Sequence, residues 1–264
     1  MINLTTALFD IGREKLGDGR TMNQYIDWFT QTLKINSSFT VFTEKKFIPL
    51  LEDKINSKSR IVCCDLEEIP YYYLRKNIED IIRDSEYRSK ISDPGRIECN
   101  LGLYNIIQYS KFKWIEASIE IDNSFDYYFW IDAGCSRFFK GEPELLYPSL
   151  ENLEIEKFNV QGNVNTSKIY PSMDIEKYKF DNNSMLVGTF FGGGRKIMGR
   201  ISGEIEKILL NDMLGANMIN NEQIAMAILY KRSPELFNVY MELNGDHLPF
   251  FNRVYPHNRN LALS

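Results

Sequence analysis

Dense clusters of basic residues are missing from this chain, whose formal net charge is −5. Neutralising the phosphates of a nucleic acid requires clustered Lys and Arg, so we expect no nucleic-acid partner. The sequence also contains no apolar stretch as long as a membrane-spanning helix, and its first residues lack the pattern of a signal peptide. These absences predict a cytoplasmic protein without a membrane span.

Cysteine and histidine are scarce, with four and two copies in 264 residues. The cysteines, at positions 63, 64, 99 and 135, do not have the spacing of a zinc site, and we expect buried free thiols in a reducing compartment. The histidines are His247 and His257. A lone histidine in a loop is more often incidental than a ligand, although neutral imidazole is a common metal ligand.

The first 64 residues alternate between strand and helix patterns. We predict strands at residues 2–9, 39–43 and 60–64, and amphipathic helices at residues 22–34 and 44–55. A strand–helix–strand–helix–strand order favours parallel pairing through right-handed crossovers. With an ordinary globular composition and no linker or repeat, the sequence predicts a single α/β domain over residues 1–264.

Further elements follow with less regular spacing. We expect a charged surface helix at residues 71–90 and a long helix at 97–121. Residues 135–181 contain scattered Gly and Pro without periodicity, which is typical of an irregular loop that shapes a site. The remaining predicted elements are a strand at 184–191, a helix at 195–214, a helix that begins near residue 221 and a strand at 236–241.

The run Asp126-Tyr127-Tyr128-Phe129-Trp130-Ile131-Asp132-Ala133-Gly134 predicts a buried central strand, because it is short, aromatic and β-branched and ends in glycine. Asp132 lies at its carboxyl end, where open α/β sheets place their ligand crevice. The carboxylate is therefore either a ligand-site acid or a turn-former that bonds to the following loop. From position alone the two interpretations are about equal.

Other segments supply groups that can meet Asp132, each with a simpler explanation. Gly12 and Arg13 follow the first strand, where they suit a phosphate or form a solvated turn. Lys111 lies in an apolar helix stripe, so it either extends to solvent or faces an anion in a cleft. Residues 192–194 are three glycines that allow a sharp bend under a ligand or a tight turn, and Glu222 is either a site acid or a capping carboxylate.

Taken together, residues 6–13 (TALFDIGR), 110–111 (SK), 129–134 (FWIDAG), 190–193 (FFGG) and 221–223 (NEQ) resemble the HtrL/YibB family of bacterial and viral proteins. The resemblance spans residues 4–223 and more. It implies a glycosyltransferase with the nucleotide-diphospho-sugar (GT-A) fold, a Rossmann-like mixed α/β sheet flanked by helices. The expected reaction moves a sugar from a UDP-sugar to a glycan, lipid-linked or protein acceptor.

The same resemblance implies roles for individual residues. The first strand and Arg13 would hold the nucleotide, Lys111 would approach the diphosphate, and the glycines would form a floor beneath the sugar. The donor-binding residues expected in this way are Thr6, Ala7, Asp10, Arg13, Lys111, Trp130, Ile131, Asp132, Ala133, Gly134, Phe191, Gly192 and Gly193.

The resemblance also implies the chemistry. Glu222 is the expected base for the acceptor hydroxyl in an inverting reaction, and Glu222 or Gln223 would position the sugar in a retaining one. Asp132 occupies the place of the GT-A metal motif and His247 would add a nitrogen ligand to Mn²⁺ or Mg²⁺. Gly134 replaces the second aspartate of that motif, which leaves one carboxylate for a cation that takes about six oxygen ligands.

Two other functions stay open from the sequence. The same diphosphate crevice would serve a nucleotide-sugar phosphohydrolase. With Gly134 in the motif, the chain would also suit a non-catalytic glycan-binding or nucleotide-binding domain that has a degenerate metal motif.

Overall fold

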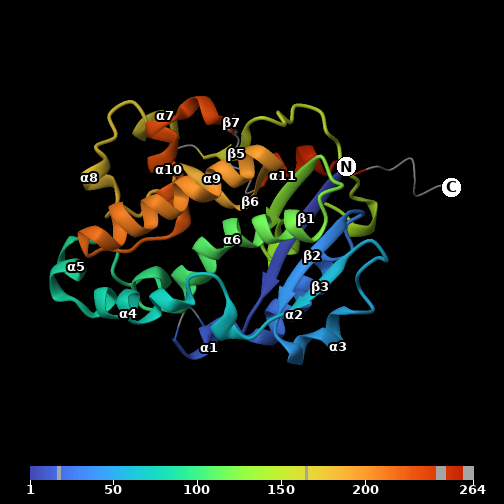
Figure 1. The fold of residues 1–264 in the computed structure, drawn as a ribbon, viewed down its shortest axis with the longest axis horizontal. Helices are drawn as coiled ribbons and strands as arrows, with labels where there is room; N and C mark the ends of the chain where they lie inside the picture. Colours follow the sequence, from blue (N-terminus) through green and yellow to red (C-terminus); the bar gives the residue numbers. More distant parts are fainter. Residues whose placement is uncertain (17–18, 164–165, 242–247, 258–264) are drawn as a thin grey trace.

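The computed structural model describes residues 1–16, 19–163, 166–241 and 248–257. Seven strands in these residues form one sheet, in the order β3-β2-β1-β4-β6-β5-β7 (Figure 1). Every pair of neighbouring strands is parallel except the two pairs that β6 makes with β4 and β5. The strands are β1 (Ile2–Leu8), β2 (Ser38–Thr43), β3 (Arg60–Cys63), β4 (Tyr127–Ile131), β5 (Phe158–Gly162), β6 (Leu186–Gly194) and β7 (Phe237–Met241). The predicted mixed α/β sheet is confirmed.

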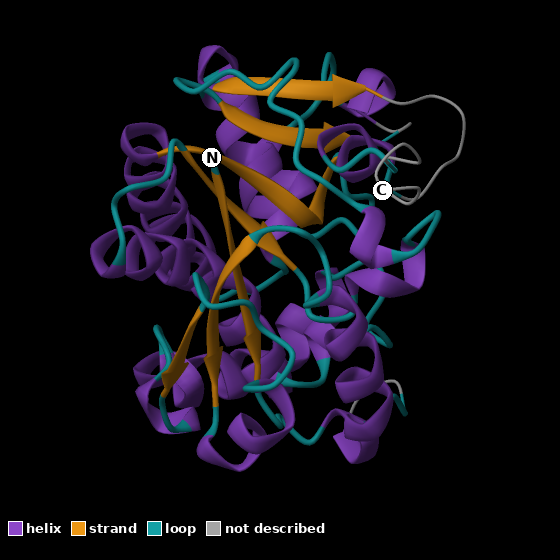
Figure 2. Cartoon of the chain, turned by 90° about the vertical axis from the view of Figure 1, so that its right-hand side faces the viewer, coloured by secondary structure: helices purple, strands orange, loops and turns teal. Residues whose placement is uncertain are grey.

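Helices cover both faces of the sheet (Figure 2). Because side chains alternate along a strand, Phe129 and Phe190 point to one face, whereas Trp130 and Phe191 point to the other. The first face packs against α2 (Met22–Thr32), α3 (Ile48–Leu51) and α11 (Pro249–Val254). The second packs against α4 (Arg75–Arg83), α6 (Gly102–Ile121), α9 (Arg195–Lys207) and α10 (Glu222–Arg232). The short helices α1 (Arg13–Leu16), α5 (Ser85–Lys90), α7 (Thr166–Ile169) and α8 (Ile175–Tyr178) lie in connections.

Several predicted helices are shorter than expected. The predicted helix at 71–90 is divided between α4 and α5, because Asp84 ends the first helix and accepts hydrogen bonds from the backbone N–H groups of Glu86 and Tyr87 in the second. The predicted helix at 44–55 is limited to a 3₁₀ turn (Lys45–Phe47) and α3. The long helix begins at Gly102, after a separate 3₁₀ turn (Ile97–Cys99). The helix at 195–214 continues beyond α9 as a π-helical segment (Ile208–Met213).

Strand β5 and the short helices α1, α7, α8 and α11 were not predicted. Strand β5 lies inside the segment expected to be irregular, and α11 lies in the tail. Strand β5 was not predicted because it contains polar residues. Asn159 is fully buried, and its side chain forms hydrogen bonds with the backbone of Glu154, Lys157 and Gly192.

The three glycines do not form the predicted turn between strand and helix. Gly192, Gly193 and Gly194 are the last residues of β6 and pair with Phe129, Tyr128 and Tyr127 of β4. A Cβ atom at Gly192 would lie 2.3 Å from the carbonyl oxygen of Tyr128. Glycine is therefore required there because the backbone of the neighbouring strand is too close for a side chain.

Gly192→Ala should lower the free energy of unfolding by about 1–3 kcal/mol, because the methyl group overpacks against backbone that cannot move independently. Urea denaturation followed by circular dichroism measures the change. Gly203→Ala is the matched control, since a Cβ atom at Gly203 meets no atom within 4 Å. Equal stability of the two variants would contradict this explanation.

None of the helices in the described ranges has the length and apolar character needed to cross a membrane. The four cysteines form no disulfide. Cys99 and Cys135 are buried as predicted, but Cys63 is exposed on β3, which lies at the edge of the sheet.

Candidate functional site

The candidate site is a cavity of about 330 Å³ at the carboxyl ends of β1 and β4. The chain leaves β1 toward β2 on one side, and β4 pairs with β1 on the other side. This reversal of strand order is the position where open α/β sheets form their ligand crevice. The volume of the cavity lies within the range of small-molecule sites.

Basic side chains outnumber acidic ones around the cavity. The lining residues come from four segments: Ala7 to Lys15 at the end of β1 and beyond it, Arg20 to Tyr25 around the start of α2, Tyr104 to Lys111 on α6, and Trp130 to Arg137 at the end of β4 and beyond it. Five are basic and three are acidic, in a chain whose net charge is −5. The basic residues are Arg13, Lys15, Arg20, Lys111 and Arg137, and the acidic residues are Asp10, Glu14 and Asp132. Such a local excess of positive charge favours an anionic ligand.

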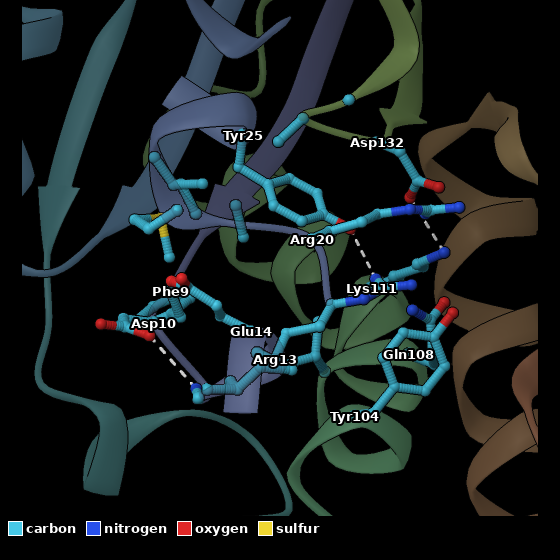
Figure 3. Close-up of a pocket in the computed structure, with 18 of the residues that line it drawn as sticks. Phe9, Asp10, Arg13, Glu14, Arg20, Tyr25, Tyr104, Gln108, Lys111 and Asp132 are labelled. Atoms are coloured by element: carbon cyan, nitrogen blue, oxygen red, sulfur yellow. Dashed lines mark hydrogen bonds and ion pairs between the residues drawn. The ribbon is translucent and has the colours of Figure 1, made fainter. Parts of the chain in front are cut away.

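Arg13 is held at the cavity by aromatic side chains (Figure 3). Its guanidinium carbon lies 4.9 Å from the ring centre of Tyr104 and 5.6 Å from that of Tyr25, and its Nη1 donates to the Tyr25 hydroxyl at 2.6 Å. The preceding turn depends on Gly12, whose φ of 71° lies in the left-handed region. Asp10 closes this turn, because its Oδ1 accepts from the N–H of Gly12 at 3.1 Å.

Lys111 joins the cavity to the interior. Its Nζ lies 2.8 Å from Glu222 Oε1, 3.0 Å from Asp132 Oδ1 and 3.0 Å from the carbonyl oxygen of Gly188. Lys111 and Glu222 are each 1 % exposed, whereas 32 % of the Asp132 side chain is exposed. The three residues therefore form a row of charges from a buried carboxyl group, through an ammonium, to a carboxylate at the cavity.

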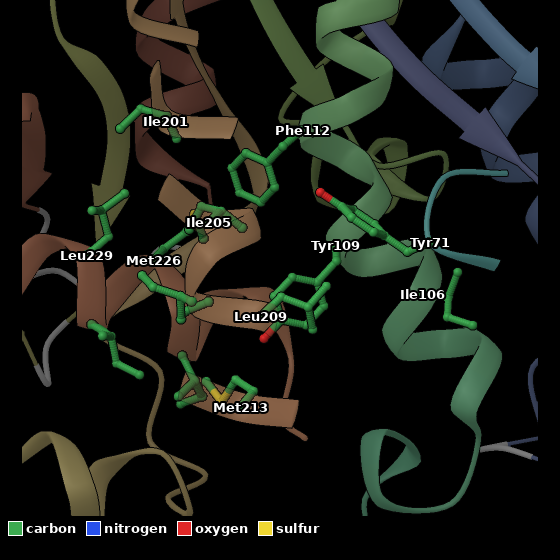
Figure 4. Close-up of a cluster of buried hydrophobic side chains, with 14 of the residues drawn as sticks. Tyr71, Ile106, Tyr109, Phe112, Ile201, Ile205, Leu209, Met213, Met226 and Leu229 are labelled. Carbon is green, nitrogen blue, oxygen red and sulfur yellow. The ribbon is translucent and has the colours of Figure 1, made fainter. Parts of the chain in front are cut away.

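The helix that carries Lys111 is anchored on both sides of it. Tyr109 and Phe112 of α6 contribute to an apolar cluster with Ile205 of α9 and Met226 of α10 (Figure 4). Side chains in such a close-packed cluster keep their positions. The buried ammonium is thus fixed relative to the start of α10, where Glu222 is the first helical residue.

Burial and neighbouring charges have opposite effects on the pKa values of Glu222 and Lys111. Burial raises the pKa of Glu222 to about 7, and the attraction of Lys111 limits the rise. Burial alone would lower the pKa of Lys111, but Asp132 and Glu222 raise it overall, so this lysine stays charged. Near neutral pH the interior therefore contains an ammonium beside a carboxyl group that is close to its titration point.

The Lys111 ammonium is engaged within the protein by two hydrogen bonds and by an ion pair with Asp132. An ammonium has three N–H groups, and three oxygens lie within 3.0 Å of Nζ. A phosphate that approaches Lys111 would compete with Asp132 and Glu222 for this ammonium. Asp132 is also constrained at one oxygen, because Oδ1 accepts from Trp130 Nε1 at 2.7 Å, and its side chain lines the cavity.

The side chains around Asp132 do not fit a divalent cation. Across the described residues, no group of three or more His, Cys, Asp or Glu could hold a metal ion. Oδ1 of Asp132 is occupied by the Lys111 ammonium, which would repel a second cation. His247, the other predicted ligand, lies outside the described residues.

Comparison with protein families shows to which family this chain belongs. Residues 1–255 match the family described as "Bacterial protein of unknown function (HtrL_YibB)". The chain belongs to the HtrL_YibB family. A search of curated proteins finds no match to it.

The structure of this HtrL_YibB protein brings most of the predicted site together. The cavity lining contains eight residues that were predicted to bind a donor, namely Ala7, Asp10, Arg13, Lys111, Trp130, Asp132, Ala133 and Gly134. They come from three separate segments: the end of β1 and the turn after it, α6, and the end of β4 and the loop after it. The prediction that these segments meet is confirmed, whereas binding of a donor by them stays a prediction.

Five predicted donor-binding residues do not line the cavity. Thr6 and Ile131 are fully buried and belong to strand positions that face the α2 side of the sheet. Phe191 pairs with Trp130 inside the sheet and is also fully buried. Gly192 and Gly193 lie toward the amino end of β4, away from Asp132, so they cannot form a floor beneath a sugar in this cavity.

The predicted positions of Glu222 and Gln223 at a substrate need correction. Glu222 is buried behind Lys111 and does not line the cavity, so it cannot reach an acceptor hydroxyl in this conformation. Gln223 Oε1 accepts from the backbone N–H of Gly188 at 3.3 Å, beside the row of charges. The glycine that matters here is Gly188, because a Cβ atom there would lie 2.1 Å from Glu222 Oε1.

Sequence reasoning missed several lining residues. Tyr104 and Gln108 precede Lys111 by seven and three positions, the spacing of one helix face, and this signal was present in the sequence. Arg20 and Arg137 had no comparable signal, because each lies in a segment without periodicity.

The raised pKa of Glu222 predicts a pH dependence of stability. Between pH 4.5 and about 7 the folded state binds more protons at Glu222 than the unfolded state, so stability should fall as the pH rises through this range. The total is on the order of 3 kcal/mol. Glu222→Gln has no such proton, so urea unfolding of both proteins at pH 5 and pH 8 should show a larger fall for the wild type. Parallel falls would contradict the assignment.

Proposed function

We propose that this protein is a glycosyltransferase with a GT-A-like fold and that the cavity binds a nucleotide-diphosphate sugar, with a UDP-sugar as the expected donor. The acceptor would be a glycan, a lipid-linked glycan or a protein. One observation carries the proposal: a cavity with excess basic side chains and aromatic walls lies at the strand-order reversal between β1 and β4.

The lining chemistry suits the parts of such a donor. The guanidinium groups of Arg13, Arg20 and Arg137 are planar donors that match phosphate oxygens. Tyr25 and Tyr104 provide aromatic surface next to Arg13, and such surface stacks on flat rings such as a nucleobase. Hydroxyl groups of the sugar or acceptor have a hydrogen-bond acceptor in Asp132.

In the proposed reaction an acceptor oxygen attacks the anomeric carbon of the sugar. The bond between that carbon and the diphosphate oxygen breaks, its electron pair stays on the leaving diphosphate, and the acceptor hydroxyl loses its proton. Fixed positive groups stabilise the charge that develops on the leaving group. Arg13, Arg20 and Arg137 are the side chains we assign to this task, and the Asp132 carboxylate is the group we assign to accept the proton of the acceptor hydroxyl.

A bound Mn²⁺ or Mg²⁺ would stabilise the same developing charge. Because the described side chains around Asp132 do not fit a divalent cation, no step above depends on one. Titration of the donor with and without Mn²⁺ tests the predicted cofactor directly.

A thermal-shift screen against UDP, other nucleoside diphosphates and their sugar conjugates tests the proposal, since a ligand that binds the folded state raises its melting temperature. Calorimetry then measures the affinity of UDP. Arg137→Ala should weaken UDP binding by about tenfold or more, because a charged hydrogen bond is lost. Arg200→Ala is the matched control, because this arginine lies on α9, outside the cavity.

The products distinguish the alternatives. Release of UDP that requires an acceptor indicates transfer, and release without one indicates a phosphohydrolase. Binding without turnover indicates a non-catalytic domain. Absence of stabilisation by any nucleotide or nucleotide sugar, with both arginine variants behaving like the wild type, would overturn the proposal.

A further inference from the structure

We infer that Glu222 is a positioning residue: from the protein interior it holds the Lys111 ammonium, and through this ammonium it fixes the Asp132 carboxylate at the cavity. The effect of this arrangement on a donor or acceptor rests on the proposed function. The arrangement itself does not, and it assigns Glu222 a role other than the acceptor base that the family resemblance implies.

Glu222 is built into the interior rather than placed beside a ligand. It is the first residue of α10, and Asn221 caps this helix by accepting from the N–H groups of Gln223 and Ile224. The capped backbone directs the side chain toward β6, where Gly188 leaves room for it, as the 2.1 Å approach of a built Cβ atom to Oε1 shows. A side chain at position 188 would occupy the space of the carboxyl group.

The contacts of Lys111 transmit this position to Asp132. Glu222 Oε1 and the Gly188 carbonyl oxygen accept two hydrogen bonds from the ammonium, and these hold Nζ in an ion pair with Asp132 Oδ1 at 3.0 Å. Trp130 Nε1 donates to the same oxygen at 2.7 Å. With Oδ1 held from two sides, rotation of the carboxylate is blocked and the side chain keeps one orientation.

A contribution to stability does not by itself account for the buried pair of Glu222 and Lys111. Removing two charges from water costs free energy, and replacing a buried ion pair with well-packed apolar residues is often neutral or stabilising. Glu222 Oε2 adds to this cost, because it is buried and has no hydrogen-bond partner within the described structure. A positioning role explains the arrangement, since the buried pair contacts the one carboxylate of the row that reaches the cavity.

The indole N–H of Trp130 reports on the Asp132 carboxylate without any ligand, because it donates to Oδ1. The chain has three tryptophans, so Trp28→Phe and Trp114→Phe assign the three indole resonances in a ¹H–¹⁵N spectrum. Glu222→Gln retains an oxygen for Lys111 and should leave the Trp130 resonance near its wild-type position. Glu222→Asp retracts the carboxylate by one methylene, and Gly188→Ala displaces it from the other side, so both should shift the resonance. Gly203→Ala is the control.

UDP calorimetry on the same variants measures the consequence at the cavity. We expect Glu222→Gln to bind UDP within about twofold of wild type, and Glu222→Asp and Gly188→Ala to bind UDP at least about tenfold more weakly. If either displacing variant folds and leaves the Trp130 resonance unchanged, the positioning role is overturned. If the resonance shifts as expected but the wild type binds no nucleotide, the positioning role stands and the proposed function fails.

Discussion

Replacing Lys111 with methionine is expected to lower the free energy of unfolding by about 3–5 kcal/mol at pH 8. Methionine has a similar volume, so packing changes little, but Glu222 loses its counter-charge while it stays buried. Domains of this kind are stable by roughly 5–15 kcal/mol, so the variant should unfold at much lower urea concentrations.

Two comparisons separate this effect from a general loss of packing. Lys111→Met combined with Glu222→Leu should recover most of the lost stability, because no unpaired charge is left in the interior. Lys113→Met is the matched control, since Lys113 is on the same helix and pairs with Glu116 and Glu206 nearer the surface, where ion pairs contribute about 0–1 kcal/mol. Additive losses in the double variant would contradict the interpretation of the row of charges.

Asp132→Asn is expected to reduce sugar transfer by at least about 100-fold while lowering the free energy of unfolding by only about 1 kcal/mol. Asparagine has the same shape, and its oxygen can still lie beside the Lys111 ammonium and accept from Trp130, so the fold keeps its contacts. The group that faces the cavity changes from a carboxylate oxygen to an amide, which removes a negative acceptor from the proposed site.

The measurement combines UDP release from the donor that stabilises the wild type with urea denaturation of both proteins. Asp126→Asn makes the same charge change at the opposite end of β4, where Asp126 is exposed and pairs with the N-terminus, and it should retain activity. A loss of stability as large as the loss of activity would make Asp132 a structural turn residue instead.

The central sheet was predictable where the local pattern and the tertiary environment agree. The run Tyr127 to Ile131 is apolar or aromatic at every position, and both faces of β4 are buried, so its pattern indicated a central strand. The position of Asp132 followed directly from the end of this strand. The order of strands in the first 64 residues likewise predicted the parallel half of the sheet, which defines the reversal where the cavity forms.

Other features depended on partners that are distant in the sequence. A glycine run is typical of turns, and only the close approach of the Tyr128 backbone shows why Gly192 is in a strand. Whether Glu222 is exposed or buried is decided by Lys111, 111 positions away, and by Gly188. Strand β5 buries polar side chains that bond the backbone, so its composition resembled that of a loop.

The reversed strand β6 has a consequence for synthesis on the ribosome. Strand β4 leaves the ribosome well before its neighbour β6. Until β6 follows, the backbone N–H of Asp132 lacks its acceptor, the carbonyl oxygen of Thr189. At usual translation rates the interval is on the order of ten seconds, during which an aromatic strand has an unpaired edge. We therefore expect the nascent chain to be prone to aggregation in this interval.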